Sequence, residues 1–270
     1  MQRTQHSSGP RPIRRNWKRV VQCSPALVAP SRYVSELMEF SLALGAPAFE
    51  KHYRRFLDDP RGQRLLRERP DLPAVLGDRD ALAACAGDSF ARAYVDFTSR
   101  YRFDASAFEA AHDIDGMAQR LGWDDDFAYL ITRGLQTHDL WHTLAGYGPD
   151  WAGEAGVMAF TYGQIPNAGV GIVAGILAAI SGDVPRKRWN RFVKQAWRRG
   201  RSADYLLVAP YEDLLPHPID DVRRELGIAP LTVAHPEGLP YTSFRYGFAK
   251  AMSTGYDVPS PADQRVRSAA

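Results

Sequence analysis

Apolar side chains recur at three- and four-residue intervals through most of this chain, and this spacing constrains its fold more than any other feature. Residues at such intervals lie on one face of an α-helix. No stretch alternates apolar and polar residues over a length that would build a sheet. Prolines and glycines separate the helical stretches. We therefore predict an all-α protein with a single helical domain.

The two ends of the chain differ from its middle. Residues 1–22 hold six Lys or Arg and no acid, together with several Ser, Gly and Pro. We predict a flexible basic N-terminal arm over residues 1–30, although this composition also fits a transit peptide. The helical domain is expected over residues 31–230, and a Pro-rich C-terminal extension over residues 231–270.

Helix boundaries inside the domain follow from caps and breakers. We expect one helix to begin near Ser31 and a second to begin at Pro47, because proline suits the first turn of a helix. The same reasoning predicts further helices at about residues 80–101, 106–121, 124–146, 150–164, 167–180 and 185–199.

Composition excludes several classes of protein. Apolar residues make up 45% and charged residues 24% of the 270 residues, which is ordinary for a globular chain. The two cysteines, Cys23 and Cys85, lie far apart, so neither a disulfide framework nor a thiolate metal cluster is expected. No run of about 18 apolar residues predicts a transmembrane helix. The formal charge of +3 is too small to indicate nucleic-acid binding.

The candidate chemistry lies in the stretch HDLWH, residues 138–142. His138 and His142 are four residues apart, so on a helix both imidazoles lie on one face and can bind one metal ion. Asp139 is about 100° around the helix and can reach the edge of the same site. Glu154 follows after a Gly146–Gly148–Pro149 break, where the chain can reverse and return a carboxylate.

Two imidazoles and two carboxylates suit zinc, with iron(II) or manganese as alternatives. Four protein ligands would close a tetrahedral site, whereas three would leave a position for water or substrate, and the sequence does not decide between them. The residues alone also leave open that His138 and His142 are two histidines on a helix with no metal between them.

The segment HDLWHTLAGYGPDWAGE resembles the H-D-x-x-H, eleven residues, E signature of the Coq4 family of ubiquinone-biosynthesis proteins. The resemblance runs from about Tyr94 to about Gly227. It includes the lead-in ITRGLQT, the Gly153–Glu154 pair, the stretch AFTYGQ and the late VRRELGI. The first 30 residues and the proline-rich tail do not share it.

This resemblance implies an all-helical protein that binds a divalent metal, usually zinc, through His138, Asp139, His142 and Glu154. It implies removal of the C1 carboxylate of a polyprenylated hydroxybenzoate, in an oxidative or a simple decarboxylation, with Asp139 and Glu154 acting through the metal. It also implies a peripheral position on the membrane that holds the quinone pathway, and contact with other quinone-biosynthesis proteins. We expect a homo-oligomer.

A basic amphipathic stretch, residues 185–201, holds eight Lys or Arg and no acid. We predict that Arg188, Trp189, Phe192 and Trp197 contact an anionic membrane surface, because basic helices with tryptophan suit such surfaces. The alternative is a helix packed in the core with a solvated outer face. Nucleic acid is not expected as a partner. The membrane is taken as the cytoplasmic face of a bacterial inner membrane, with the matrix side of a mitochondrial inner membrane as the alternative.

Three further alternatives stay open. The apolar run Ala168–Ile180 fits a tunnel for an isoprenoid chain and equally a buried core helix. The protein as a whole is either a lyase or a non-catalytic lipid-binding scaffold with a structural metal. A phosphohydrolase of the His-Asp helical type would instead use His112 and the His138–Asp139 pair as metal ligands.

Overall fold

The computed structural model describes residues 14–27, 34–101, 114–148, 150–179, 181 and 184–233. These residues form α-helices, short 3-10 helices and connecting turns, and none of them belongs to a strand. The predicted all-α class is therefore confirmed. None of the described helices is both long enough and apolar enough to cross a membrane.

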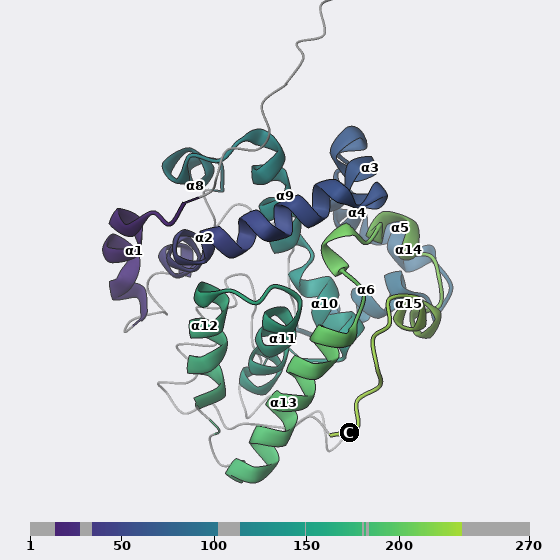
Figure 1. The fold of residues 1–270 in the computed structure, drawn as a ribbon. Coiled ribbons are helices and arrows are strands. Elements are labelled where there is room, and N and C mark those ends of the chain that lie inside the picture. The colour runs from purple at the N-terminus through teal and green to yellow at the C-terminus, as the bar shows by residue number, and fades with distance from the viewer. Residues whose placement is uncertain are drawn as a thin grey trace, which may run out of the picture.

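The helices follow the apolar spacing of the sequence, and Figure 1 shows their arrangement. Their bounds in chain order are α1 Trp17–Cys23, η1 Ser24–Leu27, α2 Val34–Asp58, α3 Pro60–Glu68, α4 Leu72–Gly77, α5 Arg79–Ala84, α6 Phe90–Tyr101, α8 Ile114–Leu121, α9 Asp125–Gln136, α10 His138–Ala145, α11 Trp151–Gln164, α12 Ala168–Ala179, α13 Arg186–Ser202, η3 Leu206–Val208, α14 Tyr211–Leu214 and α15 Ile219–Glu225.

Helices α11, α12 and α13 form the lower half of the molecule in Figure 1, and α2 crosses above them. Helix α11 packs along both α12 and α13, while α12 also packs against α2. Helix α10 lies against α6, α9 and α11. One continuous core joins these elements, with Trp141, Phe160 and Phe192 among its fully buried side chains.

The predicted N-terminal arm is wrong over residues 14–27, which form α1 and η1. Asn16 caps α1 by accepting a hydrogen bond from the backbone N–H of Arg19. Val20 and Cys23 are buried against α2. Arg19 also pairs with Glu39, a carboxylate that is only 2% exposed. The basic composition of this segment hid an apolar stripe, and one of its cations, Arg19, serves as the partner of a buried acid. The rest of the arm, and the tail after Val233, lie outside the described residues.

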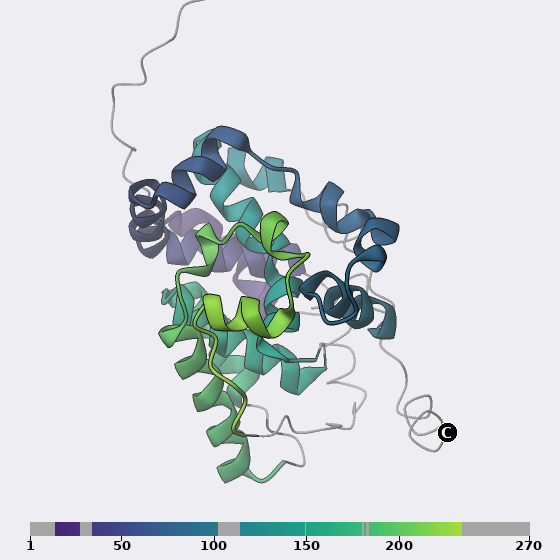
Figure 2. The same ribbon diagram turned by 90° about the vertical axis from the view of Figure 1, so that its right-hand side faces the viewer.

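The predicted helix start at Pro47 is also wrong, because α2 continues through this proline. Proline removes one backbone hydrogen bond and bends a helix. Figures 1 and 2 show the two halves of α2 running in different directions. Each half buries an aromatic residue, Phe40 before the proline and Phe49 after it, and this burial holds both halves in place.

The predicted helices 80–101 and 124–146 each split into two. The first breaks between α5 and α6. The second breaks at Thr137, which ends α9 and precedes α10. His138 therefore begins a new helix, and His138 and His142 still share it. The segment predicted as a helix at 106–121 is described only as α8, from Ile114 onward.

The structure corrects the predicted membrane contacts on α13. Trp189 and Phe192 have no exposed surface, and the Trp189 indole donates a hydrogen bond to the Ala178 carbonyl oxygen. These two aromatic rings pack in the core and cannot reach a membrane from there. Arg188 is exposed and Trp197 is half-buried. The spacing identified the apolar face of α13 correctly, but the other helices cover that face.

Candidate metal centre

Two short elements place the candidate metal ligands. Helix α10 carries His138 on its first turn and His142 on its last. Gly146 ends the helix in a left-handed conformation, with φ of 74°, which glycine adopts without steric cost. The chain then turns into α11, whose first turn carries Glu154. Pro149 itself lies outside the described residues. The helices on either side of it confirm that the chain reverses between them.

Two imidazole nitrogens and one carboxylate converge between these helices. The Nε2 atoms of His138 and His142 are 3.2 Å apart. Glu154 Oε2 lies 3.7 Å from His138 Nε2, and Glu154 Oε1 lies 3.5 Å from His142 Nε2. Ligands that bind one zinc ion tetrahedrally at about 2.0–2.1 Å lie about 3.3 Å from one another. The observed separations therefore fit three ligands of a single ion.

His142 is oriented for metal binding by its second nitrogen. The side chain is fully buried, and its Nδ1 lies 3.1 Å from the Tyr147 carbonyl oxygen. A carbonyl oxygen only accepts hydrogen bonds, so Nδ1 carries the proton and Nε2 presents its lone pair to the site. The Phe97 ring stacks on the imidazole at 5.7 Å between centroids. Burial opposes a charge on His142, but the nearby Glu154 carboxylate raises its pKa.

Glu154 is a buried carboxylate, with 3% of its surface exposed. Burial raises the pKa of Glu154, but His142 and His138 overcome this effect and lower it to about 2. Its place in the first turn of α11 also favours negative charge. Glu154 is therefore ionised, and its charge requires a cation nearby, either a protonated imidazole or a metal ion.

Asp139 does not join the converging atoms. The group of described ligand atoms that lie within 4.8 Å of one another contains His138, His142 and Glu154, without Asp139. Asp139 is half-buried, and its charge is among the influences that raise the pKa of His142. Its role as a metal ligand stays a prediction. Three protein ligands would leave an open position, as in catalytic zinc sites and in the two-histidine, one-carboxylate iron sites.

The alternative ligand set of a His-Asp phosphohydrolase depends on His112, which lies outside the described residues. In the described part of the chain, the triad just named is the single group of at least three candidate ligands that converge. The structure therefore brings His142 and Glu154 together with His138, whereas the phosphohydrolase alternative gives neither His142 nor Glu154 a role.

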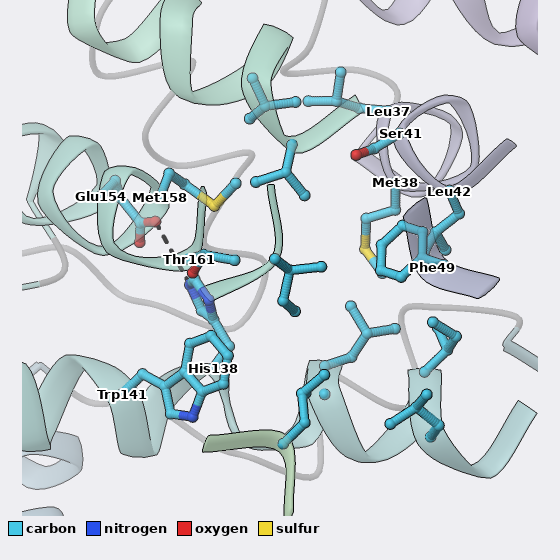
Figure 3. A pocket seen from close by; sticks show the side chains of 18 residues that line it. Leu37, Met38, Ser41, Leu42, Phe49, His138, Trp141, Glu154, Met158 and Thr161 are labelled. Atoms are coloured by element: carbon cyan, nitrogen blue, oxygen red, sulfur yellow. Dashed lines mark ion pairs between the residues drawn. The ribbon is translucent and has the colours of Figure 1, made fainter. Parts of the chain in front are cut away.

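An apolar cavity of about 180 Å³ adjoins the triad, and both His138 and Glu154 line it. Figure 3 shows these two residues with Met158 and Trp141 on one side, and Leu37, Met38 and Phe49 of α2 on the opposite side. The remaining lining residues are Ser41, Leu42, Leu130, Ile131, Gly134, Leu135, Thr161, Ile165, Val170, Val173 and Leu207. His138 and Glu154 thus form one polar corner of a pocket with apolar walls.

Helix α12, the apolar run, fits both alternatives that the sequence left open. Gly169, Val173 and Leu177 are buried in the core, and Val173 also lines the cavity together with Val170. The sequence missed the walls contributed by α2 and α9. Their apolar spacing predicts a buried face, but nothing local says that this face borders a cavity instead of a packed core.

Comparisons with known proteins identify the family of this chain. The family model described as "Coenzyme Q (ubiquinone) biosynthesis protein Coq4" matches residues 12–232, a longer region than the one recognised in the sequence. The match therefore includes α1, within the first 30 residues that seemed unrelated.

Three relatives illustrate the range. A mitochondrial ubiquinone biosynthesis protein of Coprinopsis cinerea is 26% identical over 178 residues, covering 64% of this chain and 57% of the relative. An Aedes aegypti homolog is 28% identical, with coverage of 77% and 73%. A rat homolog is 28% identical, with coverage of 64% and 62%. The chain thus spans about three-fifths of the length of several curated relatives.

A crystal structure supports the fold alone. It shows a protein of Nostoc punctiforme provisionally assigned to ubiquinone biosynthesis, with a TM-score of 0.58 and 18% sequence identity. The alignment covers 80% of this chain and 99% of that protein. Since the family model covers most of the sequence, including the HDLWH segment and Glu154, this chain belongs to the Coq4 family of coenzyme Q biosynthesis proteins.

Proposed function

We propose that this protein acts in ubiquinone biosynthesis and removes the C1 carboxylate from a polyprenylated hydroxybenzoate. One observation carries the proposal: the convergent ligands His138, His142 and Glu154 adjoin an apolar cavity, and His138 and Glu154 form its polar corner. A substrate with a carboxylate on an aromatic ring and an isoprenoid tail has the same polarity, charged at one end and apolar elsewhere. The names of the relatives support the pathway.

The cavity suits the ring of this substrate. An apolar protein cavity of about 150 Å³ holds one benzene molecule. The cavity beside the triad measures about 180 Å³, so it has room for a substituted ring. Its apolar walls exclude water from the ring, and this lowers the local dielectric around the charged corner.

A divalent cation held by the triad, zinc or alternatively iron(II) or manganese, would bind the substrate carboxylate or phenolate and stabilise negative charge as carbon dioxide leaves. His142 and Glu154 would supply buried ligands, and the Tyr147 carbonyl oxygen orients His142. His138, whose side chain is 29% exposed, would supply a ligand that borders the cavity.

The simple reaction consumes one proton, because a hydrogen replaces the carboxylate on C1 and carbon dioxide is released. The oxidative reaction puts a hydroxyl group there instead. It consumes dioxygen, two electrons and three protons, and it releases water with the carbon dioxide. Zinc cannot relay these electrons. The oxidative reaction needs a reductant with either kind of metal, and a redox-active metal would only pass the electrons on to dioxygen.

The proposal predicts release of labelled carbon dioxide from a prenylated 4-hydroxybenzoate carrying ¹³C in its carboxylate. We expect release by the metal-loaded protein and loss of release in Glu154→Gln. Asp139→Asn separates two roles for Asp139: lost turnover indicates an essential residue, and retained turnover indicates that the triad suffices. The measurement is headspace mass spectrometry, with the exposed Glu225→Gln as the matched control.

A folded, metal-loaded protein that binds this compound and releases no carbon dioxide, with or without a reductant and dioxygen, would contradict the lyase proposal. That result would favour the alternative function, a lipid-binding scaffold whose metal is structural.

We further propose that the exposed cations of α13 contact an anionic membrane. Arg188, Arg191, Lys194 and Arg198 are exposed, and no acid occurs within the helix. The rings of Trp189 and Phe192 take no part. Cations near an anionic bilayer contribute roughly 1 kcal/mol each. The names of the fungal, insect and rat relatives call those proteins mitochondrial, which supports the mitochondrial membrane of the two considered.

Vesicle sedimentation tests this membrane contact. Replacing Arg188, Arg191 and Lys194 together by Gln should weaken binding to phosphatidylserine-containing vesicles roughly 100-fold, at roughly 1 kcal/mol for each cation. The matched control replaces Lys51, Arg54 and Arg67, which are exposed on α2 and α3. Equal binding by both variants, or equal binding of wild type to neutral vesicles, would rule out this surface.

A further inference from the structure

At the C-terminal end of α10, arginine side chains donate hydrogen bonds to three of the last four carbonyl oxygens. A helix leaves four carbonyl oxygens without partners inside the helix. The first of these, on His142, accepts hydrogen bonds from the backbone N–H groups of Gly146 and Tyr147. The next two, on Thr143 and Leu144, accept from Arg223. The last, on Ala145, accepts from Arg199.

Arg199 joins three separate segments. It lies on α13 and is only 5% exposed. Its Nη1 donates to the Ala145 carbonyl oxygen at 2.8 Å and to the Tyr147 hydroxyl oxygen at 2.9 Å. Its Nε donates to the Ala229 carbonyl oxygen at 2.6 Å. A lysine carries one compact ammonium group and cannot reproduce this divided set of contacts.

Arg223 holds the same helix end from α15. Its Nε donates to the Leu144 carbonyl oxygen at 2.9 Å, and its Nη2 donates to that of Thr143 at 3.2 Å. Its neighbour Arg224 makes an exposed ion pair with Asp221 instead. Two cations at the end of a helix also offset the negative end of its dipole.

This helix end determines the direction of a metal ligand. The Tyr147 carbonyl oxygen accepts the Nδ1 hydrogen bond that turns the His142 Nε2 toward Glu154. Tyr147 is two residues past the end of α10, and its hydroxyl is bound to Arg199. The position of that carbonyl group therefore depends on the arginines that hold the end of the helix.

We propose that Arg199 and Arg223 are positioning residues that aim His142 at the metal by fixing the segment from Thr143 to Tyr147. The proposal rests on the proposed metal centre. The hydrogen bonds of both arginines go to residues other than His138, His142 and Glu154. Both come from parts of the sequence far from the HDLWH motif, and Arg223 gives the VRRELGI stretch a role at this site.

The test is the affinity of the metal-free protein for Zn²⁺, together with the visible absorption spectrum of the Co²⁺ form. Groups that orient a metal ligand typically contribute 10–100-fold to affinity. We expect Arg199→Met and Arg223→Met each to weaken Zn²⁺ binding about 10–100-fold and to change the Co²⁺ spectrum. Exposed arginines serve as matched controls, and Arg67→Met and Arg224→Met should keep wild-type affinity.

A control must show that lower stability by itself does not weaken Zn²⁺ binding. Leu65→Ala truncates a buried side chain on α3 that is not among the residues around the metal corner, and it should lower stability while keeping wild-type affinity. If Arg199→Met does not fold, the half-buried Arg223→Met decides the question. Wild-type affinity in both arginine variants overturns the inference alone. A wild-type protein that binds neither ion overturns the metal centre and the inference with it.

Discussion

Glu154→Gln is expected to lose its metal while keeping its fold. The substitution preserves the size of the side chain and replaces the one buried carboxylate among the three convergent ligands. A neutral amide is a weaker ligand for a divalent cation. Because removing a ligand should cost at least as much as removing a group that orients one, we expect Zn²⁺ affinity to fall by about 100-fold or more.

Elemental analysis and isothermal titration measure this loss, and circular dichroism follows the fold. Glu225→Gln removes an exposed carboxylate of the same type and should keep the wild-type metal content. If Glu154→Gln purified with a full equivalent of metal, the ion would have to bind elsewhere in the protein.

Gly153→Ala is expected to damage both the fold and the metal site. A methyl group at this position would lie 1.5 Å from the Gly148 carbonyl oxygen and 2.4 Å from its carbon. Both atoms belong to the backbone, so no side-chain rotation can relieve the overlap. Overpacking of a core usually costs about 1–3 kcal/mol. Displacement of the backbone at the first turn of α11 should reach the upper end of that range.

The neighbouring Glu154 would move with this turn, so Zn²⁺ affinity should fall together with stability. A loss of about 3 kcal/mol lowers the melting temperature of a domain of this size by roughly 6–12 °C. Gly175→Ala is the matched control, since a methyl group there meets no atom within 4 Å on helix α12. Replacing that glycine should leave stability unchanged or raise it by about 0.5–1 kcal/mol. Equal melting temperatures for wild type and Gly153→Ala would contradict this prediction, because they would show that the backbone of the turn moves at little cost in free energy.

Local patterns predicted the parts of the site that depend on local geometry. His138 and His142 are one helical turn apart, and the glycine break before Glu154 allows the chain to reverse. These relations need no information from distant residues. The split at Thr137 did not disturb them, because both histidines lie on the same side of it.

The failures share one physical reason, which is that a sequence pattern shows which face of a helix is apolar but not what covers it. Trp189 and Phe192 have the spacing of a membrane-contacting face, yet other helices bury them. Val20 and Cys23 lie in a segment with the composition of a free arm, yet α2 covers them. Nothing in the sequence near Arg199 indicates its role, because its side-chain hydrogen-bond partners lie 30 or more positions away in the chain.

The unequal burial of the two histidines bears on how a bound ion would exchange. His142 has no accessible surface and Glu154 very little, whereas His138 is partly accessible, and both His138 and Glu154 border the cavity. If the triad holds an ion, a molecule that fills the cavity would lie beside two of its three ligands. Such a molecule would be expected to slow the removal of the ion by a chelator.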